Sequence, residues 1–191
     1  AGTTLNLLAQ PGSSLLGQYT MGRIIGVNNA TIVATTSTTD VTLGIGDLES
    51  QSTDTTGLSP ARLRVSPTNT RGVIKAGTLF LTGTGNSIID VASTAVNNQI
   101  TSGVTGSGLL VSALNGSRDL IKWGNGYLWV GSDNSSSFSG DLIIEQGAIG
   151  VTHANAFGNA GTSITARRFG VLDILTTGFT KTVTYEPASI E

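Results

Sequence analysis

Short segments in which apolar and polar residues alternate recur along this chain, most clearly in its C-terminal third. Three of them are 126–130 (GYLWV), 147–151 (GAIGV) and 170–174 (GVLDI). In each, a glycine precedes two large aliphatic residues two positions apart, which is the side-chain period of a β-strand with one buried face. The glycines are 21 and 23 residues apart. A strand that returns at this spacing predicts a solenoid, in which each coil stacks on the one before.

Weaker copies occur at 41–45 (VTLGI), 63–65 (LRV) and 77–81 (GTLFL), separated by polar tracts rich in Gly, Ser and Asn. We therefore predict an all-β fold, a parallel β-solenoid with coils of about 21–23 residues. The alternative is a β-sandwich, but only 115–116 and 125–126 supply the Asn-Gly pairs that close two-residue hairpins. We place the solenoid at 27–191, with its repeat clearest at 106–174, and treat 1–26 as an extended capping or strand-exchange segment.

Aliphatic residues of the predicted strands should face inward in stacked rows, because a coil can bury its apolar face only against its neighbours. The residues expected in these rows are Leu128, Val130, Leu142, Ile144, Ile149, Val151, Leu172 and Ile174.

Composition supports a folded β protein and excludes several partners. Gly, Thr, Ser and Asn make up close to half of the chain, 38% of residues are hydrophobic and 12% are charged, with a net charge of −2. The absence of a Lys/Arg cluster argues against nucleic acid and anionic membranes. No apolar run is long enough to insert into a membrane as a helix. Abundant Thr, Ser and Asn with few Lys and Glu favours an exported protein that is extracellular or on the cell surface.

Six elements follow one another in order between residues 106 and 174. They are 106–110 (GSGLL), 126–130 (GYLWV), 138–140 (FSG), 142–144 (LII), 147–151 (GAIGV) and 156–158 (AFG). This order resembles the autotransporter-associated β-helix repeat of secreted passenger domains and large bacterial surface proteins. The chain departs from that pattern at Tyr127 and Trp129, where small residues are usual, and at Phe157, where Leu is usual. The resemblance implies a right-handed parallel β-helix, export, and a scaffold or adhesive role without catalytic residues.

Residues suited to metal binding or catalysis are sparse. His153 is the single histidine and cysteine is absent, so a zinc site is not expected. The best calcium candidates are four acids that match no calcium-loop spacing: Asp40, Asp47, Glu49 and Asp54. The nearest local charged pairs are Asp119 with Lys122 and Asp141 with Glu145; the latter two lie ~13 Å apart along a strand, too far for a local carboxylate pair. We expect no enzyme activity, no cofactor and no metal.

Aromatic and N-terminal residues offer surfaces for partners instead. Tyr127 and Trp129 flank Leu128, so they should point outward, and with Trp123 they could stack on sugar rings or enter a subunit interface, unless a neighbouring loop covers them. The uncharged N-terminal segment contains five leucines suited to strand exchange with a neighbouring subunit or to capping of its own: Leu5, Leu7, Leu8, Leu15 and Leu16.

These features together predict an exported, non-enzymatic structural solenoid. It would act as a surface scaffold, adhesin or self-assembling filament subunit, as a homo-oligomer or polymer, with a glycan or cell-surface molecule as a further candidate ligand. The alternative is a β-helix that binds or cleaves carbohydrate, of the phage-tailspike or polysaccharide-lyase type.

Overall fold

The computed structural model describes residues 3–9, 22–36, 42–53, 61–67, 73–92 and 108–187, which form β-strands and no helix. Hence none of the described residues belongs to a helix that could span a membrane. The strands are β1 (Thr3–Ala9), β2 (Ile24–Val27), β3 (Asn29–Thr36), β4 (Thr42–Gly44), β5 (Leu48–Ser52), β6 (Ala61–Pro67), β7 (Val73–Gly83), β8 (Ser87–Val91), β9 (Gly108–Gly116), β10 (Leu120–Trp123), β11 (Tyr127–Val130), β12 (Leu142–Val151), β13 (Ile164–Ile174) and β14 (Val183–Glu186).

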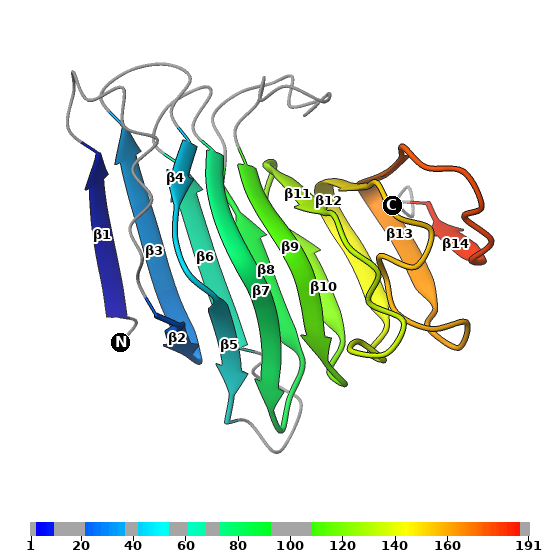
Figure 1. Cartoon of the computed structure of the whole chain (residues 1–191), viewed down its shortest axis with the longest axis horizontal. Helices are drawn as coiled ribbons and strands as arrows, with labels where there is room; N and C mark the ends of the chain where they lie inside the picture. The colour runs from blue at the N-terminus through cyan, green and yellow to red at the C-terminus, as the bar shows by residue number, and fades with distance from the viewer. Residues whose placement is uncertain are drawn as a thin grey trace.

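The strands stack in three rows, and every pairing between described strands is parallel. The first row contains β1, β3, β6, β8 and β10, then the first halves of β12 and β13, and finally β14. The second row contains β4, the first halves of β7 and β9, β11, and the second halves of β12 and β13. The third contains β2, β5 and the second halves of β7 and β9, and Phe138 then bridges to Gly116. The chain is therefore a parallel β-solenoid, and Figure 1 shows its strands side by side from β1 at one end to β14 at the other.

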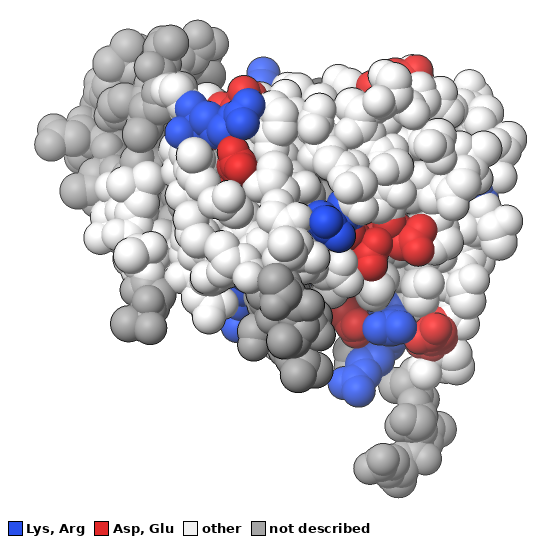
Figure 2. Space-filling model, turned by 90° about the horizontal axis from the view of Figure 1, so that it is seen from below, with Lys and Arg blue, Asp and Glu red and all other residues white. Residues whose placement is uncertain are grey.

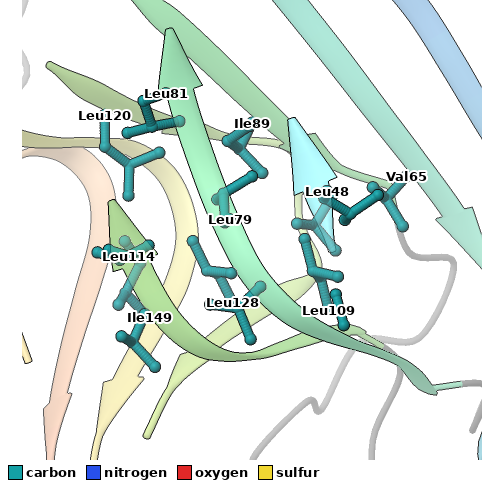
Figure 3. Close-up of a cluster of buried hydrophobic side chains, with 14 of the residues drawn as sticks. Leu48, Val65, Leu79, Leu81, Ile89, Leu109, Leu114, Leu120, Leu128 and Ile149 are labelled. Atoms are coloured by element: carbon teal, nitrogen blue, oxygen red, sulfur yellow. The ribbon is translucent and has the colours of Figure 1, made fainter. Parts of the chain in front are cut away.

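The core runs along the inside of these rows as columns of aliphatic residues. Leu128 lies between Leu109 and Ile149 of the neighbouring coils, and all three are fully buried. Figure 3 shows these residues converging with Leu79 and Leu114 inside the stack. Six of the eight predicted core residues have no exposed surface, which confirms the predicted register: Leu128, Val130, Leu142, Ile144, Ile149 and Val151.

The last two predicted core residues stack in register on Ile149 and Val151, as expected, but their burial is incomplete. Leu172 is only partly buried and Ile174 is 43% exposed. They lie in the second half of β13, whose only strand partner in the described structure is β12, because β14 pairs with the first half of β13 alone. A solenoid position is buried from both sides, so a position with one neighbouring coil stays half open.

The coil length is also less uniform than the sequence suggests. Leu120, Leu142 and Ile164 occupy equivalent positions 22 residues apart, as predicted. Earlier coils are longer: Leu63 and Ile89 are 26 residues apart. The segment 77–81 belongs to the third row and not to the second row with the other glycine-led segments, because Leu79 pairs with Leu48 and Leu114.

Glycines open the second-row segments because the chain turns a tight corner there. Gly147 has φ 75°, in the left-handed region, and a Cβ on it would lie 2.3 Å from the carbonyl oxygen of Gly124 in the preceding coil. A Cβ on Gly170 would likewise lie 2.3 Å from the oxygen of Ile144. These glycines lie at successive corners between the first and second rows, so their spacing along the chain is the spacing of those corners.

Side-chain carboxylates and amides connect successive coils. Asp119 Oδ1 accepts a hydrogen bond from the backbone N–H of Asp141 at 3.0 Å, and Asp141 Oδ1 accepts one from Ser163 N–H at 2.8 Å. The buried Asn134 accepts from Leu114 N–H at 3.0 Å and donates to the oxygen of Ala156 at 2.7 Å, which joins three coils. Corner amides that the strand ladder leaves unpaired are satisfied in this way.

Candidate functional site

The outward side of the first row gathers charged and aromatic side chains. Arg62 of β6 donates to Asp90 Oδ2 of β8 from Nη2 at 2.6 Å and from Nε at 3.2 Å. Arg64 is 3.7 Å from the same oxygen, so two guanidinium groups share one nearly buried carboxylate. The guanidinium carbon of Arg62 also lies 4.9 Å from the ring centroid of Trp123 on β10. The Asp90 carboxylate thereby fixes Arg62, and Arg62 supports the indole by a cation–π contact.

A second charge cluster lies at the C-terminal end of the same row. Arg167 of β13 donates to Glu145 Oε1 of β12 at 2.8 Å and to Glu186 Oε2 of β14 at 2.6 Å. These two ion pairs raise the pKa of Arg167, so the guanidinium stays charged. Figure 2 shows that charged residues on the face it presents form small clusters of both signs, separated by uncharged surface.

A groove of about 530 Å³ lies along this row, over β8, β10, β12 and β13. Ile88 and Ile121, which pair with each other in register, contribute apolar lining. The other lining residues are aromatic or polar: Trp123, Glu145, Gln146, Arg168 and Phe169. Trp123 is 40% exposed and Phe169 is 77% exposed, so both rings are accessible to solvent.

A β-bulge displays the residues at the C-terminal side of the groove. Ala166 pairs with Ile144 and Phe169 pairs with Gln146, so two residues of β13 oppose one residue of β12. Arg168, the second of the two, has φ 50°, which is unusual for a residue other than glycine. Bulges bend a strand and re-aim its side chains, and here Arg168 and Phe169 both line the groove.

Beneath this face lies the buried Lys122, which the sequence suggested only as the partner of Asp119 in a local charged pair; in the structure Lys122 bonds backbone oxygens and Asp119 accepts from Asp141 N–H. Lys122 occupies an inward position between Ile89 and Ile144 and has no exposed surface. Its Nζ donates to the backbone oxygens of Trp123, Gly124 and Gln146 at 2.8, 2.7 and 3.2 Å. Burial lowers the pKa of Lys122 to about 7, and the nearby charge of Asp90 opposes the shift. The lysine therefore caps carbonyl groups at the corner and is closed to solvent. In the sequence, the burial of Lys122 was indicated by its position two residues after Leu120, because residues two apart on a strand point to the same side.

The three predicted aromatic residues have different environments. Trp123 is exposed in the groove. Tyr127 points away from the core, as expected, but is only 1% exposed, so at this residue the alternative of coverage by a neighbouring part of the chain applies. Its ring lies over Gly150 of the next coil, and its hydroxyl donates to Asp173 Oδ2 at 2.9 Å. Burial and this carboxylate both raise the pKa of Tyr127. Trp129 is partly buried, with its ring centroid 6.0 Å from that of Tyr127.

The predicted strand-exchange segment is only partly described. Leu5, Leu7 and Leu8 lie in β1, which pairs with β3 of its own chain, and Leu5 is partly exposed. Leu15 and Leu16 lie outside the described residues.

Among the acidic residues considered for calcium, the two that the structure describes are engaged in separate contacts. Asp47 accepts from Thr78 N–H at 2.7 Å, Glu49 pairs with Arg23 at 3.1 Å, and Asp40 and Asp54 lie outside the described residues. His153 Nδ1 accepts from the N–H of Asn155 in its own loop at 3.2 Å. In the part of the chain that the structure describes, no three His, Asp or Glu residues form a group that could hold a metal ion.

No protein-family model, curated protein or solved structure matches this chain. The resemblance to the autotransporter-associated repeat therefore depends on the motifs in the sequence alone.

Proposed function

We propose that this chain is an exported, non-enzymatic structural β-solenoid that acts as a surface scaffold or adhesin. The observation that supports the proposal is the use of its carboxylates. Every Asp and Glu among the described residues accepts a hydrogen bond from within the chain, and for all of them except Asp133 the closest donor belongs to another coil. A general acid or base must instead be free to exchange a proton with a substrate. In this protein, these groups connect coils and neutralise arginines.

Asp119 gives the direct test of this assignment. An Asp119→Ala change leaves the Asp141 N–H without its acceptor, which should cost about 1–3 kcal/mol of unfolding free energy. Asp133→Ala is the control, because Asp133 is exposed, accepts from Ser135 N–H of its own turn at 2.9 Å, and has only a longer bond of 3.3 Å from Asn155 of the next coil. Urea unfolding monitored by circular dichroism measures both. Equal stability of the Asp119 variant and the wild-type protein would contradict a role of this carboxylate in coil stacking.

Enzymatic function is tested separately with the purified protein. Incubation with neutral and acidic polysaccharides, followed by measurement of reducing ends, should show no turnover. Cleavage of any of them would refute the non-enzymatic scaffold and favour the alternative of a carbohydrate-cleaving β-helix. Surface labelling of intact and lysed cells of the source organism tests export, which predicts labelling without lysis.

Self-association into an oligomer or polymer is a second proposal, favoured by open strand edges. Among described residues β14 pairs only with β13, and the adjoining surface exposes Val171, Ile174, Val183 and Tyr185. Unpaired edges with apolar neighbours recruit further strands. We expect the mass measured by sedimentation to grow with concentration and Val183→Lys to suppress that growth. A wild-type protein that stays monomeric at high concentration would refute this proposal.

A further inference from the structure

We propose that the groove over β8, β10, β12 and β13 binds a polysaccharide whose β-linked pyranose rings stack on Trp123 and Phe169. This inference goes beyond the scaffold function, because it assigns a ligand class to one surface and requires no turnover. Its basis is the pairing of two exposed aromatic rings with hydrogen-bonding groups in one groove.

Trp123 is held in place before any ligand arrives. Arg62 lies over the ring, and Asp90 fixes Arg62 by two hydrogen bonds. Asp90 also has Arg64 beside it. A ring whose orientation is set by such a network loses little conformational entropy on binding, so its exposed surface is a preorganised platform.

Exposing the apolar ring of Phe169 to water costs free energy unless a ligand covers the ring. It is 77% exposed and sits directly after Arg168, at the bulge between β12 and β13. Left-handed backbone at a non-glycine residue costs free energy and recurs at ligand sites. Here the strained position displays one guanidinium and one phenyl ring in the same groove.

The polar groups of the groove match the hydroxyl groups of a sugar. Glu145 supplies an acceptor whose charge is balanced by Arg167, and Arg168 supplies donors and forms no ion pair with a described carboxylate. Gln146 uses its Nε2 on Asn125, which leaves its amide oxygen as an acceptor in the groove. Sugar hydroxyls both donate and accept, and the axial C–H faces of β-linked pyranoses are flat and apolar, so they suit aromatic rings flanked by such groups.

A nucleic acid fits this surface less well. Single-stranded nucleic acid also stacks on aromatic rings, but its binding sites follow the backbone with an excess of basic residues. In this row Arg62, Arg64 and Arg167 are engaged by Asp90, Glu145 and Glu186. The whole chain carries a net charge of −2.

The test uses the fluorescence of Trp123 as the reporter. In a Trp129→Phe background Trp123 is the single tryptophan, and titration with cellohexaose or with a β-1,4-linked hexamannuronate should change its fluorescence saturably. Calorimetry with the wild-type protein should give the same dissociation constant. The neutral and acidic probes distinguish the two ligand types: affinity for the hexamannuronate alone, lost in Arg168→Ala, identifies an acidic polysaccharide. Binding of cellohexaose that survives Arg168→Ala identifies a neutral one.

Phe169→Ala should weaken binding roughly tenfold, a loss that one stacked ring readily explains. Because Phe169 is so exposed, this variant should fold normally, whereas Trp123→Ala also removes packing against Arg62. Ile25→Ala is the control, because Ile25 is 55% exposed on β2, outside the groove. Failure of both probes to bind at millimolar concentration, or equal binding by the Phe169 and Ile25 variants, would overturn the proposal. Neither result would affect the scaffold function, which is tested by turnover and by Asp119.

Discussion

The solenoid should become more stable as the pH rises above neutrality, because the buried Lys122 loses its proton at a lower pH in the folded chain than in the unfolded chain. Burial lowers the pKa of Lys122 from 10.5 to about 7 in the folded protein. Between these two values the unfolded chain binds a proton at this residue that the folded chain does not bind. Stability therefore increases with pH across this window.

The magnitude follows from the size of the shift. Each pH unit inside the window contributes about 1.4 kcal/mol, so the full effect is roughly 5 kcal/mol, and roughly 3 kcal/mol is gained between pH 7 and about pH 9.5. The three carbonyl oxygens that accept from Nζ reduce this gain, because a neutral amine has one N–H fewer to donate.

The assay compares urea unfolding of wild type and Lys122→Met at pH 7 and about pH 9.5. Unfolded tyrosine begins to ionise near the higher pH, but it does so in both proteins and therefore cancels in the difference. The wild type should gain stability relative to Lys122→Met as the pH rises. Lys75→Met is the matched control, because Lys75 is exposed, and it should retain the pH response of the wild type. A constant difference between wild type and Lys122→Met over this range would refute the reasoning.

Three further changes test the packing. Ile149→Ala should cost about 2–5 kcal/mol of unfolding free energy because Ile149 is fully buried. Ile174→Ala should cost well under half of that, because Ile174 is 43% exposed. Equal losses of stability in denaturant titrations would contradict the assigned register. Gly150→Ala should lower the melting temperature clearly, because its Cβ would lie 2.0 Å from Tyr127 Oη, while at Gly131 the nearest atoms are 3.9 Å away and the change should be mild. Tyr127→Phe should cost about 1–2 kcal/mol through the lost hydrogen bond to a carboxylate, and an unchanged unfolding midpoint would show that this bond does not stabilise the fold.

The sequence alone identified the strands of the C-terminal coils and their register. Leu128, Ile149 and Leu172 pair as the glycine-led segments predicted, because a two-residue alternation that recurs every coil leaves one way to bury the apolar face. The long coils before residue 108 were harder to delimit. Leu63 and Leu79 were expected in strands, but the row to which a strand belongs depends on the length of the connections between corners.

The candidate site was predictable only in part. Trp123 was singled out as an exposed aromatic residue, but the residues that accompany it come from coils that are neighbours in space and far apart in sequence. Arg62 and Asp90, which hold its ring, are 28 residues apart. No fixed spacing in the sequence identifies such a pair, because the sequence separation of residues in contact between coils depends on the lengths of the loops between them.

The sequence therefore determined the fold class and the inward aliphatic rows of its C-terminal coils, because alternation and a regular glycine spacing are local properties of the chain. The tertiary structure alone decided the fate of individual side chains. Tyr127 is buried because the next coil presents Gly150 beneath its ring, and Lys122 is buried because the corner above it offers three carbonyl oxygens. Burial in a solenoid is set by the adjacent coil, and the identity of the residue that the adjacent coil places there depends on the length of every loop between them.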